Sequence, residues 1–454
     1  MNEYNISKYS KKIINFLDNN FINILDNKYT QYDNHNIIKY LQNLIKTTYK
    51  LQYEYDIKIT DMLKIHDRDE YPLMYIFFIK LNENKLYEIK NINNFYEFTK
   101  WYKCNQHNID FNLIKSKISE LEKKDDSLIQ IFDLMYNHQG HRSELHKMLY
   151  QNQFMPLDVQ HYIESIDMKK CVIRSPDYSL VIYNPDDNIL DCEFINKIIH
   201  IIYIMIGLAK NSNNNNKPDI TLILTSQKKL INELYDEGTL SPCNINSGAS
   251  IPAHNVIIWR KEEIYKVLIH ELIHFFEFDF HLFHKGYDKL KKHVMETYNI
   301  TNNDCPNESY TECFATVIHS TFVADKLNLS FSQIFRYELT FSLFQVSKCL
   351  SFFGITDVKQ IGTKKIKQTT SVFSYFVIKS MLIYNLNKVF DFIHNDIKNI
   401  KITDRISEFN TLIKESATDE YFALLQTFLD KFHSIQNNKT FINNTMRMTC
   451  FQLN

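Results

Sequence analysis

Two histidines and a glutamate stand at a spacing that suits metal chemistry. They are His270, Glu271 and His274, in the sequence H-E-L-I-H, inside a mostly apolar stretch at residues 266–281. No Gly or Pro occurs from residue 260 to 285, so this stretch is predicted to form a helix. Residues four apart lie one turn apart on the same helix face, so both imidazoles can reach one metal ion. Glu271, one position further on, would face a water molecule bound to that ion.

The same pentapeptide has a plainer interpretation. The chain contains 17 His, so the pattern can arise by chance in a buried apolar helix whose histidines are satisfied by hydrogen bonds. A catalytic zinc site also needs a third protein ligand. His284 is near in sequence, but helical spacing turns it away from the histidine face. A separate group, His138, His141 and His146, matches no closed ligand set.

Two carboxylates at helical spacing follow downstream, in the sequence N-E-S-Y-T-E-C-F-A at residues 307–315. Pro306 suits the start of a helix, on which Glu308 and Glu312 would lie one turn apart. An exposed acidic helix face is one interpretation. The apolar residues around Phe314 favour a buried helix instead, and buried carboxylates need a partner or a metal.

The elements that position these residues alternate along the chain. Short strands are predicted at 171–174, 180–183, 220–224 and 254–259, with an apolar helix at 194–210. Gly207 suits close packing within that helix, and Gly248 would permit a bulge, a close backbone approach or an ordinary turn before the last strand. Long apolar helices are predicted at 331–353, 371–393, 404–415 and 420–433.

This order of strands, backing helix and H-E-x-x-H helix resembles the upper lobe of the zincin metallopeptidases. The resemblance implies one Zn²⁺ per chain, bound by His270 and His274, and hydrolysis of a peptide or protein substrate with Glu271 as the general base. It also implies an edge strand to which an extended substrate adds by main-chain hydrogen bonds. In this sequence the edge strand would consist of Ala253, His254, Asn255, Val256, Ile257 and Ile258.

The downstream segment resembles the second motif of the gluzincins, N-E-x-x-[ST]-[DE]. By that resemblance Glu308 supplies the third zinc ligand, and Glu312 accepts a hydrogen bond from a ligand histidine. Glu312 replaces the commoner Asp, which leaves the reverse assignment open. The metzincin pattern fails, because Glu277 and Phe280 stand where it requires Gly and His, and His281 is one residue out of register. Zincins usually add a donor for the developing oxyanion, with Tyr375 preferred here among the candidates Tyr310, Tyr337, Tyr375 and His319.

Composition excludes several other classes of protein. Lys+Arg 52 against Asp+Glu 53 gives a net charge of −1, so neither nucleic acid nor a membrane is an expected partner. The longest mostly apolar run, at 198–209, is shorter than the about 20 residues that span a bilayer, and the N-terminus lacks a signal-peptide core. The 8 cysteines contain no C-x-x-C pair, which fits reduced thiols and a cytoplasmic location, in a host cell or a virion if the protein is viral.

The sequence therefore predicts an α+β chain with a zincin-like fold: a small twisted mixed sheet, a backing helix, the H-E-x-x-H helix and a mostly helical lower lobe. Residues 1–165 would form a mostly helical N-terminal domain, 166–282 the upper lobe and 283–454 the lower lobe with the third ligand. The chain resembles uncharacterised zincin-like peptidases of large DNA viruses. Two other functions stay open: an inactive zincin fold that binds or scaffolds, and a metal-free structural helical protein.

Overall fold

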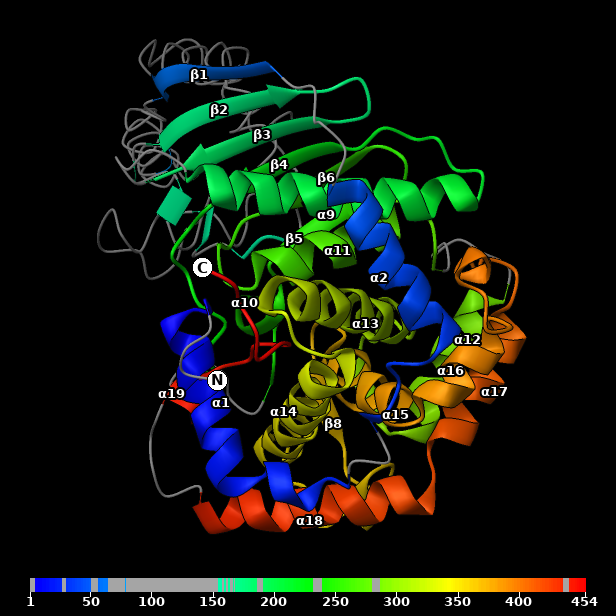
Figure 1. Ribbon diagram of the computed structural model, residues 1–454. Coiled ribbons are helices and arrows are strands. Elements are labelled where there is room, and N and C mark those ends of the chain that lie inside the picture. Colours follow the sequence, from blue (N-terminus) through cyan, green and yellow to red (C-terminus); the bar gives the residue numbers. More distant parts are fainter. Residues whose placement is uncertain are drawn as a thin grey trace, which may run out of the picture. The chain divides into compact units, whose positions relative to one another are not determined.

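The structure is a computed structural model that describes residues 5–26, 30–49, 56–63, 78, 154–156, 159–160, 162–163, 166, 168–185, 191–231, 239–279, 286–435 and 441–454 (Figure 1). Packing divides the chain into two compact units. One comprises Met1–Asp61, Phe154–Pro156 and Met168–Asn454, and the other comprises Met62–Gln153 and Leu157–Asp167. The division at residues 165 and 282 stays a prediction, whereas the packing joins the first sixty residues to the C-terminal two thirds of the chain.

The described elements are mostly helical, with one larger sheet. The strands are β1 (Asp56–Leu63), β2 (Met168–Arg174), β3 (Ser179–Asn184), β4 (Asp219–Ile223), β5 (Gly248–Ile251), β6 (Asn255–Ile258), β7 (Ile300–Asn302) and β8 (Ile366–Gln368). The α-helices are α1 (Lys8–Asn20), α2 (Asn36–Tyr49), α9 (Cys192–Asn211), α10 (Pro242–Ile245), α11 (Ile264–Phe275), α12 (Tyr287–Thr297), α13 (Asn307–Leu327), α14 (Phe331–Phe352), α15 (Lys379–Tyr384), α16 (Leu386–Phe392), α17 (Ile406–Ser416), α18 (Asp419–Ile435) and α19 (Phe441–Asn444). Short 3₁₀ turns lie at Ile22–Ile24, Val358–Gln360 and Ile397–Asn399, and a π-helix, η6, spans Phe373–Ile378.

The larger sheet is mixed, with the strand order β1-β2-β3-β4-β6-β5. Strands β3, β4 and β6 run parallel, with Leu180 opposite Ile220 and Ile220 opposite Val256. β2 pairs antiparallel with β3, and β5 pairs antiparallel with β6. The central strands are rich in apolar and β-branched residues, and most of their apolar side chains are buried. The expected α+β class with a small mixed sheet is therefore confirmed.

The predicted edge strand at residues 253–258 is wrong. β6 is hydrogen-bonded on both sides, to β4 and to β5, and β5 is the edge strand of the sheet. Ala253 and His254 lie in the turn between β5 and β6, with Ala253 at a φ of 56°. β5 escaped the sequence analysis because Gly248, Ala249 and Ser250 carry little of the apolar or β-branched signal that marks a strand. The sequence of β6, by contrast, is apolar because that strand is interior.

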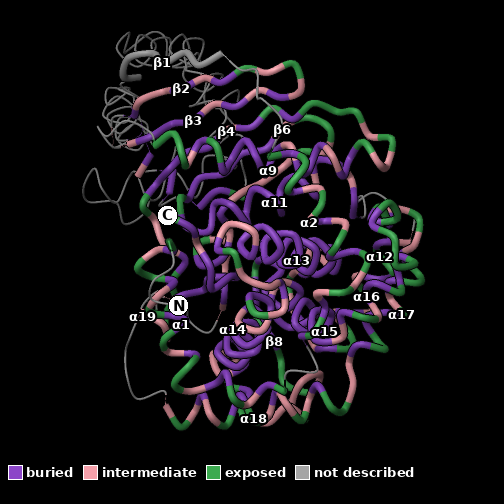
Figure 2. Tube along the Cα trace, in the orientation of Figure 1, coloured by how far each residue is buried: buried purple, intermediate pink, exposed green. Residues whose placement is uncertain are grey.

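Helix α9 lies against the sheet and packs on α2 and α11 (Figure 1). Gly207 lies where α9 meets α2, because a Cβ there would stand 2.9 Å from a methyl carbon of Leu44. The predicted close packing at Gly207 is thus confirmed. Of the described helices, α9 alone has the length and hydropathy of a membrane span, and 67% of that apolar window is buried inside the structure. That burial is what a core helix requires (Figure 2).

Helices α1, α2, α15 and α18 pack on α13 or α14, most of whose residues are buried (Figure 2). Ser330 and Gln333 form a capping box at the start of α14, and Asn328 ends α13 in the left-handed region. The helices predicted at 331–353, 404–415 and 420–433 are confirmed within a few residues. The helix predicted at 371–393 is instead divided into η6, α15 and α16, with a break at Asn385.

Candidate metal centre

Helix α11 carries both predicted histidines and the glutamate that follows the first. Its sequence is mostly apolar, and every residue in it except His274 is buried. A Schellman motif ends the helix: the amide of Phe278 donates to the carbonyl of Ile273, and that of Glu277 to His274. Glu277 takes the left-handed conformation at a φ of 55°. The helix is therefore shorter than the apolar pattern predicted, and residues 276–279 form a separate turn.

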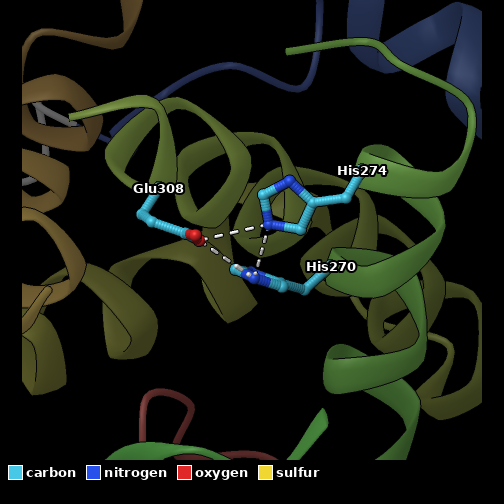
Figure 3. Close-up of side chains that lie close together, drawn as sticks. All are labelled: His270, His274 and Glu308. Carbon is cyan, nitrogen blue, oxygen red and sulfur yellow. Dashed lines mark hydrogen bonds and ion pairs between the residues drawn. The ribbon is translucent and has the colours of Figure 1, made fainter. Parts of the chain in front are cut away.

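Three side-chain atoms from two helices converge at one point (Figure 3). The Nε2 atoms of His270 and His274 lie 3.1 Å apart. Oε2 of Glu308, on α13, lies 3.3 Å from Nε2 of His270 and 3.1 Å from Nε2 of His274. Ligand atoms about 2.0–2.2 Å from a tetrahedral ion stand roughly 3.3–3.5 Å from one another, so the three separations are close to those around a single bound ion.

The far side of the His270 ring faces a second carboxylate from the same helix α13. Nδ1 of His270 lies 2.9 Å from Oε1 of Glu312. The other oxygen of Glu312 accepts a hydrogen bond from the ammonium of Lys266, which stands one turn before His270 on α11. Glu308, and not Glu312, is therefore the carboxylate at the Nε2 atoms. Glu312 occupies the supporting position that the gluzincin resemblance implied.

The far side of the His274 ring faces Asp279, which sequence reasoning missed. Nδ1 of His274 lies 2.8 Å from Oδ2 of Asp279. The same oxygen accepts hydrogen bonds from the Asn307 amide at 2.9 Å and from the Thr311 hydroxyl at 3.1 Å. In the sequence Asp279 follows the aromatic run F-F-E-F, and in the structure it is buried. An acid among aromatic residues needs a buried partner, and that was the signal in the sequence.

These contacts bear on the protonation of both rings. A carboxylate only accepts hydrogen bonds, so the 2.9 Å and 2.8 Å contacts with Glu312 and Asp279 favour a hydrogen on each Nδ1. In a neutral imidazole the lone pair then lies on Nε2. Two such lone pairs and one carboxylate oxygen would meet at the same point, which is repulsive unless a cation or a proton lies among them. The arrangement therefore requires positive charge at the centre.

The shifts in pKa report the same requirement. Burial lowers the pKa of His270, but Glu308 and Glu312 outweigh it and raise that pKa to about 9. Asp279 and Glu308 likewise hold the pKa of His274 well above its ordinary value, against the opposing effect of burial. Burial favours the neutral form of Glu308, yet the two histidines lower its pKa to about 2. The group is thus a set of anionic and electron-donating atoms that could hold a metal ion.

Glu271 is held in a different way, beneath the edge strand β5. A Cβ placed on Gly248 would stand 2.6 Å from Oε1 of Glu271 and 2.9 Å from its Cγ, so only glycine fits there without displacing that side chain. The predicted close backbone approach at Gly248 is therefore confirmed. Burial raises the pKa of Glu271, and Glu308 adds to that rise, while the two histidines oppose it. A carboxylate with a raised pKa is a stronger base toward water.

The four candidate oxyanion donors lie in different places. Tyr375, in η6, has its ring centroid 6.1 Å from that of His270. Tyr310 is buried and donates to the carbonyl of Ile400, and Tyr337 donates to Asp18 on α1. His319 is buried in the core, where desolvation lowers its pKa to about 3. Among the four, Tyr375 is the one in ring contact with a proposed ligand.

Some sequence candidates lie outside the described residues. These are Phe280, His281 and His284, and the earlier group His138, His141 and His146. Within the described chain, His270, His274 and Glu308 are the group of three side chains close enough to hold a metal ion.

Comparison with known proteins adds one relative. No protein family and no solved structure match the chain. An uncharacterised protein of Acanthamoeba polyphaga mimivirus is 21% identical over 214 residues, which cover 43% of this chain. The match spans 52% of that protein, so the chain is similar to about half the length of this viral relative. Any inference about the function of the chain must therefore come from the geometry of the site.

Proposed function

We propose that this chain is a zinc-dependent metallopeptidase with a zincin-like fold of the gluzincin type. One observation carries the proposal: the Nε2 atoms of His270 and His274 and Oε2 of Glu308 converge within 3.3 Å of one another, with both Nδ1 atoms turned to carboxylates. Two imidazoles and one carboxylate are a common ligand set of catalytic zinc, which keeps its fourth position for water. Histidine-ligating sites in metalloenzymes also hold the second ring nitrogen on an outer partner, as Glu312 and Asp279 do here.

Zinc in this site would supply Lewis-acid activation of a water molecule and of the scissile carbonyl. Glu271 follows the first ligand directly on α11 and forms no described salt bridge, although His270, His274 and Ser250 act on its pKa. Its carboxylate is proposed to accept a hydrogen bond from the attacking water. It accepts a proton from that water and passes it to the leaving amine. Its raised pKa suits both steps, because the proton must be taken and then released.

The edge strand β5 provides a place for an extended substrate. No strand of the described chain pairs with its outer side. Its residues are small at Gly248, Ala249 and Ser250, and the strand lies directly beside Glu271. A peptide added antiparallel to β5 by main-chain hydrogen bonds would bring its backbone to the general base and the metal position. The proposed substrate-binding strand is therefore β5, residues 248–251, and not the predicted strand at residues 253–258.

Tyr375 is the proposed donor to the oxyanion that develops on the scissile carbonyl. Its hydroxyl stays protonated, because burial and the nearby Glu308 and Glu271 carboxylates hold its pKa well above the ordinary value. A protonated phenol can donate a hydrogen bond where negative charge develops. Tyr375→Phe removes only that donor and is expected to reduce turnover by about 10²–10³-fold while zinc stays bound.

The test is zinc content beside peptide hydrolysis. Purified parent protein, Glu308→Ala, Glu312→Ala and Glu271→Gln are measured for zinc per chain by elemental analysis and for cleavage of a quenched peptide library. We expect about one zinc in the parent, loss of zinc in Glu308→Ala, and retained zinc without hydrolysis in Glu271→Gln. Glu296→Gln, on the exposed face of α12, is the matched control and should change neither quantity.

The other outcomes separate the alternatives. Zinc without hydrolysis of any peptide would favour a zincin fold that only binds or scaffolds. A parent that binds no zinc after reconstitution would overturn the proposal and leave a metal-free helical protein. Zinc lost in Glu312→Ala but kept in Glu308→Ala would exchange the two carboxylates and contradict the geometry described above.

A further inference from the structure

Lys266 is a buried cation attached to the candidate metal centre through one other side chain. It lies on α11 with 1% of its surface exposed, one turn before His270. Its ammonium contacts Oε2 of Glu312, and Oε1 of the same carboxylate lies 2.9 Å from Nδ1 of His270. Lysine, carboxylate and imidazole therefore form one continuous chain of contacts that ends at a proposed zinc ligand.

The geometry of this chain restricts the carboxylate. Each oxygen of Glu312 has its own partner, and both partners stand on successive turns of a single helix. A carboxylate held at both oxygens cannot rotate without breaking a contact that is buried away from water, and such a loss is costly. The position of the His270 ring is linked to this carboxylate, because Nδ1 lies 2.9 Å from an oxygen of Glu312 whose other oxygen contacts Lys266.

A second buried lysine, Lys379, allows the effect of a nearby charge on Glu312 to be compared with that of a direct contact. Lys379, on α15, is also 1% exposed, and its positive charge acts on Glu312 and Glu338. Its ammonium, however, donates to the hydroxyl of Ser342 at 3.0 Å. Lys379 thus supplies charge near Glu312, and the contact described for its ammonium is with Ser342. Lys379 is therefore the comparison for a charge that acts on Glu312 without a described contact, and its effect on the pKa of Glu312 is smaller than that of Lys266.

We propose that Lys266 is a positioning residue for the metal centre: it fixes the Glu312 carboxylate and thereby the tautomer and ring orientation of the ligand His270. The inference rests on the proposed function, since it assigns a role toward the metal that the site is proposed to bind. Outer partners of ligand histidines commonly change metal affinity by about 10–100-fold when they are lost. Lys266 does not contact His270 itself, so its effect on zinc affinity would act through Glu312.

The experiment compares zinc affinity in matched variants. Dissociation constants for zinc are measured by competition with a chromogenic chelator for the parent, Lys266→Met and Lys379→Met. We expect Lys266→Met to weaken zinc binding by about 10–100-fold. We expect Lys379→Met to weaken it by about threefold or less, because a charge without a hydrogen bond to Glu312 acts only through the field. Thermal unfolding of the zinc-free variants reports whether each one folds.

A second readout follows the imidazole itself. In zinc-loaded protein with ¹⁵N-labelled histidine, we expect the Nδ1 hydrogen of His270 to exchange slowly with water, because Nδ1 is buried 2.9 Å from Oε1 of Glu312. Lys266→Met should speed the exchange of this hydrogen, whereas Lys379→Met should leave it unchanged; a merely structural role would not produce this difference. If Lys266→Met does not fold, Lys266→Gln, which keeps a hydrogen-bond donor without the charge, carries the same comparison with an intermediate loss.

The outcomes distinguish this inference from the proposed function. A parent that binds no zinc overturns both. A parent that binds zinc, with Lys266→Met within about threefold of it, overturns the role of Lys266 and leaves the metal centre standing. Equal weakening in both lysine variants, with unchanged exchange at His270, would show a charge effect and would also overturn the inference.

Discussion

Two faces of the same helix are organised on different physical principles. On one face of α11, His270 and His274 meet carboxylates and hydrogen-bond donors from α13 and from the turn after the helix. On the other face, Glu271 meets the bare backbone of Gly248 in β5. The proposed ligands are thus held by charge, and the proposed base is held by shape.

This difference predicts two kinds of failure. Removing a charged partner on the histidine face should cost folding free energy and metal affinity, because buried groups are left unpaired. Adding atoms on the glutamate face should disturb the geometry of the base while the metal ligands stay intact.

The largest effect is expected for Glu312→Ala in the zinc-free protein. The substitution leaves the ammonium of Lys266 buried without its carboxylate. Breaking a buried ion pair on one side typically costs about 3–5 kcal/mol, so the free energy of unfolding in urea should fall by that amount. Asp279→Ala removes a carboxylate that contacts the protonated His274 as well as Asn307 and Thr311. It should cost less, about 1–3 kcal/mol, because His274 keeps its second carboxylate, Glu308.

A double variant checks the reason for that loss. Lys266→Met with Glu312→Leu replaces both charges by apolar side chains and should recover most of the stability, since a buried pair is often replaceable as a unit. Zinc affinity should stay weak in the double variant, because His270 has lost its partner. A double variant as unstable as Glu312→Ala would show that the lost stability did not come from the unpaired lysine.

The next effect concerns the glutamate face. Gly248→Ala places a Cβ 2.6 Å from Oε1 of Glu271, so the carboxylate must move. A displacement of about 1 Å at a reacting group can cost 10²-fold, and we expect a loss of that order in peptide hydrolysis. Zinc content should not change. Ala249→Ser, at the next residue of β5, is the control; equal losses in both variants would mean that the strand, and not the contact with Glu271, is responsible.

The sequence predicted the histidine face much better than the glutamate face. Spacing alone places His270 and His274 on one side of a helix, and the resemblance to gluzincins named Glu308 and Glu312. Gly248 was noted, but as one of three possible features, because sequence does not say which side chain approaches a backbone. The edge strand was misplaced for a related reason: the apolar pattern marks burial, and the strand that a substrate would reach is the one without it.

The roles of Asp279 and Lys266 could not be predicted from the sequence, for a different reason. Asp279 reaches His274 because Glu277 adopts the left-handed conformation and ends α11 early. A glutamate rarely takes that role, which usually belongs to glycine, so the pattern predicted a longer helix. Lys266 lies in the apolar stretch at residues 266–281, and an isolated lysine in an apolar helix gives no sign of its partner. Tertiary packing with α13 supplies that partner.

A smaller effect is expected from Asp279→Asn. The amide oxygen can still accept the Nδ1 hydrogen of His274, but it carries no charge and makes the imidazole a weaker donor to a metal. Zinc affinity should fall by about tenfold, at the lower end of the range for outer partners. Glu277→Gln, two residues earlier in the same turn, is the matched control. A change in hydrolysis without a change in zinc affinity would argue that Asp279 acts on the glutamate face instead.

The most gradual effect is the dependence on pH, and its sign differs between the zinc-free and zinc-binding measurements. In the zinc-free protein His270 has its pKa raised from 6.5 to about 9. A raised histidine pKa stabilises the fold fully below the unfolded value, and that contribution is lost as the pH rises from about 6.5 through about 9. Zinc must displace the same proton, so zinc affinity should instead rise over this window, by at most about tenfold per pH unit for each proton released. Glu271→Gln should preserve both trends, because the titrating groups lie on the histidine face. Zinc affinity that is flat from pH 6.5 to 9 would place the cation away from His270 and remove the basis for distinguishing the two faces.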